Sequence, residues 1–391
     1  MIQSNYDGKT LRFTLPERVD SNNAPALEQE IQACVQANPA EFVIADCDDL
    51  VYISSAGLRV LLRVRKRNPN FKLINVCSEV YDILDMTGFS EIIEAEKAFR
   101  KLSVEGCEKI GQGANGAVYR IDRDTIVKVY LNPDALPEIQ RERELARTAF
   151  VAGVPTAIPF DIVRIGESYG SVFELLDAKS CAQLLASGEK SVDEIAEMCV
   201  ELAKQIHATV VKPGSMPDMR LVALDWAAFL RDYLPPEQSE KLYALIEAVP
   251  EDFHMLHGDY HIKNVMVQNG ESLLIDMDTL CYGNPIFELG SMFNAYLGFA
   301  EVDHSIEEKF MGISYETAKE LWEKMLYLYL ETEDEARIRE VERKAQIIGY
   351  ARILRRRIRR NGFDSDLGRR EIELCKQHLA ELLPITDSLL Y

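Results

Sequence analysis

The chain has 391 residues, of which 47 % are hydrophobic and 28 % charged, a composition typical of a globular protein with two or three domains. Its formal net charge of −20 argues against a general nucleic-acid binder, because neutralising phosphates requires basic surface. No apolar run reaches the roughly 18 residues of a membrane span, and the first residues lack the basic and apolar regions of a signal peptide, so a cytoplasmic protein without membrane contact is predicted.

The first hundred residues alternate predicted strands and helices. Strand patterns lie at 11–15, 42–45 and 71–76. Helical spacing of apolar residues lies at 23–36, 56–67 and 78–86. Strands that alternate with helices imply a small α/β sheet with helices packed on it.

Two serines, Ser54 and Ser55, stand directly before the second of these helices. Either serine can act as an N-cap that accepts a hydrogen bond from a free amide of the first turn. A phosphate at the same place would meet the unpaired amides and the positive end of the helix dipole. The sequence therefore allows both a structural cap and a phosphorylation switch.

Residues 1–98 resemble the STAS domain, the fold of bacterial anti-sigma factor antagonists. The resemblance rests on Arg18-Val-Asp-Ser-Asn-Asn-Ala24, Ile53-Ser-Ser-Ala-Gly-Leu-Arg-Val-Leu-Leu62 and Leu84-Asp-Met-Thr-Gly-Phe89. In that family an Asp-Ser-Ser-Gly-Leu segment carries the phosphorylated serine. By position the resemblance makes Ser55 the candidate phosphoacceptor, while Ser54 stands where the family has aspartate. It also implies a possible protein partner.

A charged stretch at 99–104 forms the predicted linker, and a glycine-rich string follows it. Residues 110–119 contain the pattern Gly-x-Gly-x-x-Gly-x-Val, whose defined positions are Gly111, Gly113, Gly116 and Val118. A dinucleotide-binding loop of this kind opens a helix, but here the chain continues as a strand, turns and returns through Lys128. Loop, hairpin and lysine together indicate a lid over nucleotide phosphates, with Lys128 holding them.

A lysine among apolar neighbours needs a counter-ion. On the predicted helix 137–152, Glu142 shares a face with apolar residues at offsets of three, four, seven and eight, whereas Glu144 points to the charged side. We therefore expect Glu142 to pair with Lys128. The backbone of the strand that ends around Glu174 and Leu176 suits an adenine edge, although a core strand would look the same.

The segment His257-Gly-Asp-Tyr-His-Ile-Lys-Asn264 carries the strongest chemical signal. Asp259 and Asn264 are five residues apart, as in a kinase catalytic loop. Two apolar runs around Asn269-Gly270 predict a tight hairpin that pairs Gln268 with Glu271. That register carries Asn264 and Asp276 to the same open end, where one magnesium ion could contact both.

Residues 105–391 resemble the aminoglycoside phosphotransferase and choline kinase-like family, a branch of the protein-kinase-like fold. The resemblance rests on the glycine string, Val127-Lys-Val129, Gly153-Val-Pro-Thr156, the segment from His257 to Asn264, and Ile275-Asp-Met-Asp278. It implies Asp259 as catalytic base, Asn264 and Asp276 as magnesium ligands, and Lys128 with Glu142 as the phosphate-gripping pair. The family usually has aspartate where Glu288 stands, a residue that braces the catalytic loop.

Together the two resemblances predict an α/β STAS domain (1–98) followed by an α+β bilobal kinase-like domain. Its β-rich N-lobe would span 105–177 and its helical C-lobe 178–391. Late in the C-lobe, the basic run 352–360 is interleaved with apolar residues and predicts an amphipathic helix with a solvated face.

The charge is unevenly spread between the two domains. Residues 1–104 have a net charge of −3, which leaves −17 for the remainder. An acidic second domain favours magnesium and polyhydroxylated or cationic acceptors, or it serves solubility alone.

Three functions fit these residues. The first is an ATP- and Mg²⁺-dependent phosphotransferase that acts on a hydroxyl group of a small molecule. The second is a protein kinase that phosphorylates Ser55 in cis or a partner STAS domain. The third is a non-catalytic nucleotide-binding regulator of the partner-switching kind. The complete catalytic set favours an enzyme.

Overall fold

The computed structural model describes residues 2–112 and 116–391. The chain divides into two compact units, which are residues 1–103 with 162–167, and residues 104–161 with 168–391. They are called the first and second units below. Within the described residues, no helix combines the length and the apolar character needed to cross a membrane.

The first unit is built on a five-stranded sheet with strand order β1-β2-β4-β6-β7. β1 and β2 are antiparallel, and the remaining neighbours are parallel. A small parallel pair, β3–β5, lies beside it. The strands are β1 (Ser4–Tyr6), β2 (Thr10–Thr14), β3 (Arg18–Val19), β4 (Phe42–Asp46), β5 (Tyr52–Ile53), β6 (Phe71–Val76), β7 (Glu94–Lys97) and β8 (Arg100–Lys101).

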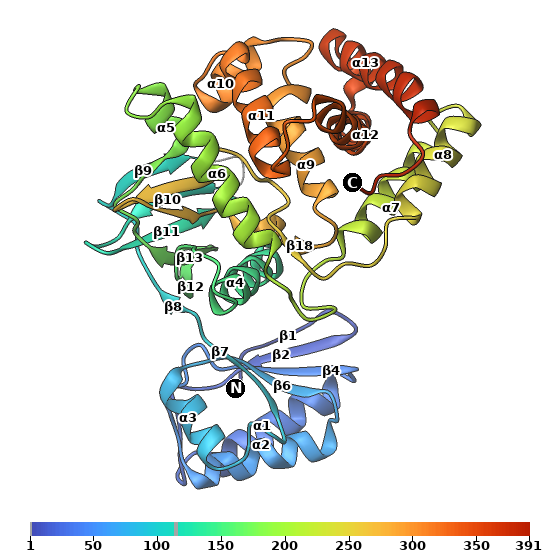
Figure 1. The fold of residues 1–391 in the computed structure, drawn as a ribbon. Coiled ribbons are helices and arrows are strands. Elements are labelled where there is room, and N and C mark those ends of the chain that lie inside the picture. The colour runs from blue at the N-terminus through green and yellow to red at the C-terminus, as the bar shows by residue number, and fades with distance from the viewer. Residues whose placement is uncertain (1, 113–115) are drawn as a thin grey trace. The chain divides into compact units, whose positions relative to one another are not determined.

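Three helices cover this sheet: α1 (Ala24–Ala37), α2 (Ser55–Arg67) and α3 (Ser78–Met86). Figure 1 shows α1 and α2 side by side against the sheet. One hydrophobic core joins them, since the apolar faces of the helices pack with alternate residues of β2, β4 and β6. The predicted strands and helices of this part of the chain are confirmed.

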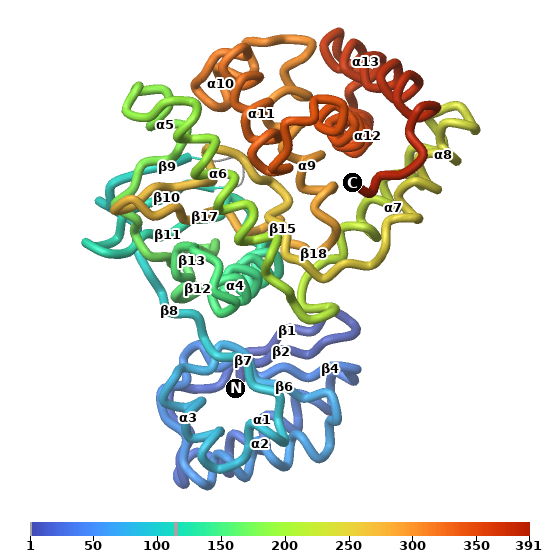
Figure 2. The backbone as a smooth tube through the Cα atoms, viewed as in Figure 1, coloured from blue at the N-terminus to red at the C-terminus, as the bar shows by residue number. Residues whose placement is uncertain are grey.

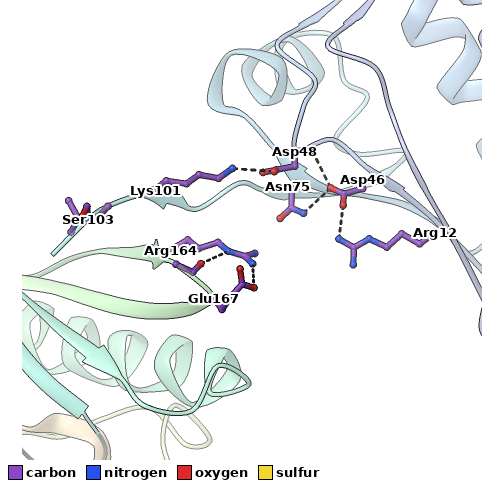
Figure 3. Close-up of a pocket in the computed structure, with 10 residues that line it drawn as sticks. Arg12, Asp46, Asp48, Asn75, Lys101, Ser103, Arg164 and Glu167 are labelled. Carbon is purple, nitrogen blue, oxygen red and sulfur yellow. Dashed lines mark hydrogen bonds and ion pairs between the residues drawn. The ribbon is translucent and has the colours of Figure 1, made fainter. Parts of the chain in front are cut away.

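Polar side chains gather at the carboxyl end of β4 (Figure 3). Asp46 accepts hydrogen bonds from Arg12 at 2.6 Å and from Asn75 at 2.9 Å. Burial opposes ionisation of Asp46, but these two donors outweigh it and hold its pKa below the usual value. Nearby, Lys101 on β8 pairs with Asp48 at 3.1 Å. These bonds tie together the ends of parallel strands that would otherwise present unpaired polar groups.

The second unit begins with an antiparallel sheet in which β13, β11, β10 and β9 are neighbours. Helix α4 (Leu136–Val151) packs beside β13, as Figures 1 and 2 show. It also packs against the short η1 segment (Met277–Thr279). The strands of this sheet are β9 (Glu108–Gln112), β10 (Gly116–Arg120), β11 (Thr125–Tyr130) and β13 (Ser168–Glu174). A further strand, β12 (Pro159–Ile165), begins in this unit, and its residues 162–165 belong to the first unit.

The rest of the second unit is mostly helical. Its helices are α5 (Cys181–Ala186), α6 (Val192–His207), α7 (Met219–Leu230), α8 (Pro236–Glu247), α9 (Ile286–Phe293), the π-helix η2 (Asn294–Gly298), α10 (Ser305–Met311), α11 (Tyr315–Leu330), α12 (Glu335–Arg359), η3 (Gly362–Asp364), α13 (Asp366–Leu382) and η4 (Leu383–Ile385). α12 packs against α9 and α7. The bilobal arrangement predicted from the sequence, a sheet-rich part followed by a helical part, is confirmed (Figure 1).

Short strands interrupt the helices where the chemical motif lies. They are β14 (Lys179–Ser180), β15 (Met255–Leu256), β16 (Val265–Gln268), β17 (Glu271–Leu274) and β18 (Cys281–Tyr282). β14, β16 and β17 form one small sheet, and β15 pairs with β18. Residues of β15, β16, β17 and β18 pack in one hydrophobic core with the helices, and the motif residues lie next to the ends of these strands.

The β16–β17 hairpin has the register predicted from the sequence. Gln268 pairs with Glu271, and Asn269 and Gly270 both have positive φ, as a type I′ turn requires. At the open end the amide of Ile275 donates to the carbonyl of Asn264 at 3.0 Å. This prediction is confirmed.

Candidate active site

Lys128 connects the sheet of the second unit to its hairpin. Its Nζ lies 2.8 Å from Oε1 of Glu142 on α4 and 3.2 Å from Oδ1 of Asp276, directly after the hairpin. Glu142 is 5 % exposed, whereas the side chain of Glu144 is 64 % exposed and pairs with Arg147. The structure thus brings Lys128 and Glu142 together and leaves Glu144 on the surface.

The carboxylates around Lys128 keep its side chain protonated. Burial opposes protonation of Lys128, but the carboxylates of Glu142 and Asp276 outweigh it and raise its pKa above the usual value. The second oxygen of Glu142 accepts a hydrogen bond of 2.6 Å from Tyr130, which sequence reasoning did not identify. Both oxygens of a buried carboxylate are therefore bonded, and the ammonium group is fixed at one place.

The glycine string lies along the same strands. Val118 on β10 pairs with Lys128 on the neighbouring strand β11 and with Gly111 on the other neighbour, β9. Gly116 has no room for a side chain, because a Cβ there would lie 2.2 Å from the carbonyl oxygen of Val129. Gly113 lies outside the described residues. The described glycines of the string therefore lie on closely packed strands next to Lys128.

Glu174 and Leu176 mark the exit from this sheet. Glu174 is the last residue of β13, and its amide donates to the carbonyl of Ile158 at 3.0 Å. Leu176 is half-buried in the segment that leads from β13 to β14. Both residues therefore lie on the connection between the sheet and the helical part.

Asp259 and Asn264 lie together on the loop between β15 and β16. The Nδ2 of Asn264 donates to the carbonyl of Asp259 at 3.0 Å, which leaves the amide oxygen as the atom available to a cation. The side chain of Asp259 is 45 % exposed, and its Oδ2 lies 3.6 Å from Nε2 of His261. Burial opposes ionisation of Asp259, but His261 and then Arg352 outweigh it and lower its pKa to about 2. Asp259 is therefore a carboxylate at neutral pH.

The histidine before Asp259 holds the loop from inside. His257 is fully buried, and its ring bonds the amide of Asp259 at 3.3 Å and the carbonyl of Ile275 at 3.1 Å. An amide can only donate and a carbonyl can only accept, so these partners assign the proton to Nε2. One buried ring thus ties the Asp259 loop to the end of the hairpin.

Negative charge is concentrated where the hairpin ends. Asp276 adopts a left-handed conformation with φ of 63°, uncommon outside glycine and frequent at functional sites. Two residues on, burial and the charges of Asp276 and Glu142 raise the pKa of Asp278 to about 7. Carboxylate and amide oxygens in such a field are the ligands that Mg²⁺ prefers. The residues present therefore fit a divalent cation held by Asn264 and Asp276.

Three further residues hold the loop that carries Asp259, and only one of them was identified from the sequence. Glu288 on α9 accepts hydrogen bonds from the backbone amides of His257 and Gly258. Ser291, one turn later, donates to the carbonyl of Gly258 at 2.9 Å, and Arg352 on α12 donates to the same carbonyl at 2.8 Å. The basic run lies on a helix as predicted, but Arg352 turns inward to the loop instead of joining the solvated face.

Gly258 permits this arrangement, and its replacement gives a direct test. Its φ is 82°, and a Cβ would lie 2.4 Å from the carbonyl oxygen of Thr279. Gly270 has a similar φ of 86° with no atom within 4 Å of a Cβ. Gly258→Ala should therefore destabilise the second unit by about 2 kcal/mol more than Gly270→Ala, which carries only backbone strain of about 1 kcal/mol. Urea unfolding measures the difference, and equal losses would show that the loop adapts freely.

In the first unit the two serines have different environments. Ser54 is the N-cap of α2, and its Oγ accepts from the amide of Gly57 at 3.4 Å. Ser55 is the first helical residue and is exposed. The structure thus gives the capping role to Ser54 and leaves the hydroxyl of Ser55 accessible.

Comparison with known proteins gives two matches along the chain. The family model described as the phosphotransferase enzyme family matches residues 106–328, and the STAS domain model matches residues 2–103. No curated protein sequence matches the chain.

Solved structures resemble the fold. A thermostable mutant of aminoglycoside phosphotransferase APH(4)-Ia, in a ternary complex with ADP and hygromycin B, has a TM-score of 0.50 and 12 % identity over 78 % of this chain and 97 % of that chain. A choline/ethanolamine kinase family protein from Mesorhizobium loti has a TM-score of 0.45 and 16 % identity, over 72 % of this chain and 88 % of that chain.

Proposed function

Because the chain belongs to the phosphotransferase enzyme family, we propose that its second unit transfers the γ-phosphate of ATP to a hydroxyl group of a small molecule. The observation that supports this proposal most is the contact of Lys128 with both Glu142 and Asp276. It joins a phosphate-gripping lysine of the β-rich lobe, proposed at 105–177, to a metal-binding carboxylate of the helical lobe, proposed at 178–391. Phosphoryl transfer needs both groups at one place.

In this proposal each side chain has one task. Lys128 holds the nucleotide phosphates, and Glu142 keeps its ammonium group in place. Asp259 accepts a hydrogen bond from the acceptor hydroxyl and orients it for in-line attack. Asn264 and Asp276 would hold Mg²⁺, which supplies positive charge beside the phosphate oxygens when bound.

The glycine string and the sheet exit would form the rest of the nucleotide site. We propose that Gly111, Gly113, Gly116 and Val118 cover the phosphates and ribose, and that the backbone from Glu174 to Leu176 binds the adenine edge. A solved phosphotransferase of similar fold binds ADP, which supports a nucleotide site in this lobe.

Binding of a nucleotide analogue tests the proposal before the acceptor is known. AMP-PNP with Mg²⁺, at about 100 times its dissociation constant, should stabilise the protein by about 2.7 kcal/mol. Asp276→Asn should raise the Mg²⁺ concentration needed for that stabilisation, while Asp193→Asn, an exposed carboxylate on α6, should not. A protein that gains no stability from AMP-PNP and Mg²⁺ is not a phosphotransferase of this kind. ATP turnover with a panel of sugars and amino alcohols then identifies the acceptor.

A second candidate acceptor is Ser55, on this chain or on a partner STAS domain. The exposure of its hydroxyl at the start of α2 favours it, since a phosphate there would meet free amides. Label from ATP on Ser55, without stimulation by any member of the panel, would favour protein kinase activity. A nucleotide-binding regulator without turnover is the remaining alternative, and it predicts binding but no ADP release.

The two serines can be separated by a pair of alanine variants. Ser54→Ala should destabilise the start of α2 by about 1 kcal/mol, because Gly57 loses its acceptor, whereas Ser55→Ala should change little. Hydrogen exchange of the amides at 56–58 in the full chain reports this difference. Equal protection in the two variants would contradict the capping role of Ser54.

A further inference from the structure

The carboxyl-terminal half of α12 carries a face of arginines with no acidic partners. Arg352, Arg356 and Arg359 fall on one side of the helix because residues three and four apart are neighbours, and Arg360 follows directly after the last helical residue. The ion pairs at this end of α12 are made by the flanking arginines, Arg355 with Asp225 and Arg357 with Glu371. Within the part of the chain that the structure describes, no carboxylate pairs with the other four. They are called the arginine face below.

The arginine face begins at the catalytic loop. The Nη1 of Arg352 donates to the carbonyl of Gly258 at 2.8 Å and contacts Oγ of Ser291 at 2.7 Å. Gly258 immediately precedes Asp259, the proposed base. The next arginine of the face is therefore about one helical turn, roughly 6 Å, from a residue that touches the loop.

Arg356 occupies that next position with an exposed side chain. Its guanidinium lies 4.9 Å from the ring centroid of Phe299, just after η2, which fixes its direction by a cation–π contact. The side chain is partly covered, and this partial burial, followed by the charges of Arg360, Arg357 and Arg352, lowers the pKa of Arg356, while the charge of Asp259 opposes this effect. Arg356 is thus within electrostatic reach of Asp259 and is repelled by its own neighbours.

Such a face is unusual in a chain with a net charge of −20. Clustered cations repel one another, and many acidic side chains are available to neutralise them. An anionic ligand removes that repulsion, and the planar guanidinium matches carboxylate and phosphate oxygens in a bidentate manner.

We propose that the alcohol phosphorylated by this enzyme carries an anionic group, a carboxylate or a phosphate, which Arg356 binds while Arg352 keeps Asp259 in place. This inference rests on the proposed function and names the substrate class of the same site. It replaces the expectation of a cationic acceptor, which considered the charge of the whole domain, with the charge found beside the base.

Anion binding to the nucleotide-loaded protein tests the inference without knowledge of the acceptor. The protein is saturated with AMP-PNP and Mg²⁺ so that the phosphate site is filled. Malonate, inorganic phosphate and 1,3-diaminopropane are then titrated separately by calorimetry. We expect at least one of the two anions to bind, and Arg356→Gln to weaken it about tenfold or more, because a charge-assisted bond is lost. If malonate binds more tightly, the anionic group of the acceptor is a carboxylate, and if phosphate binds more tightly, it is a phosphate.

Arg339→Gln is the matched control. Arg339 lies on the same helix, pairs with Glu335 on the surface and is about 25 Å from Arg356 along the axis. This variant should bind the anion as the wild type does. Absence of binding by both anions, equal binding by Arg356→Gln, or tighter binding of the diamine would each overturn the inference. Failure of AMP-PNP to bind at the loading step would instead overturn the proposed function.

Discussion

Replacing Asp259 with asparagine is expected to lower phosphoryl transfer by about two to four orders of magnitude, the usual contribution of a positioned general base. Asparagine has the same shape but presents an amide, so it accepts the acceptor proton poorly. The backbone amide and carbonyl of Asp259, which bond His257 and Asn264, are unchanged by the substitution. The loop should therefore keep its geometry, and the loss should fall on turnover.

The low pKa of Asp259 adds a pH signature. With a pKa of about 2, Asp259 is ionised throughout the range from pH 4 to pH 9. Any acidic limb of the wild-type rate profile above pH 4 must then come from another group. We therefore expect no fall in rate on acidification that is caused by protonation of Asp259. The carboxylate is free of a proton before the reaction and shares the proton of the acceptor hydroxyl only in the transition state.

ADP release under saturating ATP and Mg²⁺, with the best acceptor of the panel, measures the effect. AMP-PNP affinity should remain within about threefold of the wild-type value, which separates loss of chemistry from loss of nucleotide binding. Asp193→Asn serves as the control, because Asp193 is an exposed carboxylate that pairs with Lys324. Retention of the wild-type rate by Asp259→Asn would exclude the base role.

Local chemistry accounts for what the sequence predicted well. Asn269-Gly270 specifies a type I′ turn, and the turn alone sets the register that carries Asn264 and Asp276 to one end. Helical spacing likewise distinguishes Glu142 from Glu144, since only one of the two faces is apolar. Both inferences span fewer than fifteen residues, where backbone geometry leaves few alternatives.

Contacts between distant segments were beyond such reasoning. The pattern of α12 predicts a basic face, but only packing against α9 and α7 decides which arginine turns inward. Arg352 reaches Gly258 across 94 residues of sequence. The bond from Tyr130 to Glu142 was missed for a different reason, because Tyr130 reads as an ordinary strand aromatic. Neither residue type carries a signal of its own.

Glu288 gives the second large effect, and here stability should fall together with activity. It is 1 % exposed, and its carboxylate accepts from the backbone amides of His257 and Gly258. Burial opposes its ionisation, but His207, whose Nε2 lies 3.7 Å away, and the backbone amide of His257 outweigh that effect and keep the pKa of Glu288 below the usual value. In Glu288→Gln one side-chain amide would face a backbone donor, which leaves a buried amide without an acceptor. We expect Glu288→Gln to lower the free energy of unfolding by about 2–4 kcal/mol.

Glu288→Asp keeps the charge on a shorter side chain, so it should lower the free energy of unfolding less than Glu288→Gln does. Urea unfolding followed by tryptophan fluorescence isolates the second unit, because both tryptophans, Trp226 and Trp322, lie in it. A lowered folded-state pKa means that the carboxylate contributes fully above the unfolded value near 4.3 and loses its contribution as pH falls below it. The difference in the free energy of unfolding between wild type and Glu288→Gln should therefore be constant from pH 6 to pH 8 and become smaller below about pH 4. A difference in the free energy of unfolding that increases on acidification would mean that Glu288 is protonated in the folded protein. The amides of His257 and Gly258 would then be bound by a neutral carboxylic acid instead of a carboxylate.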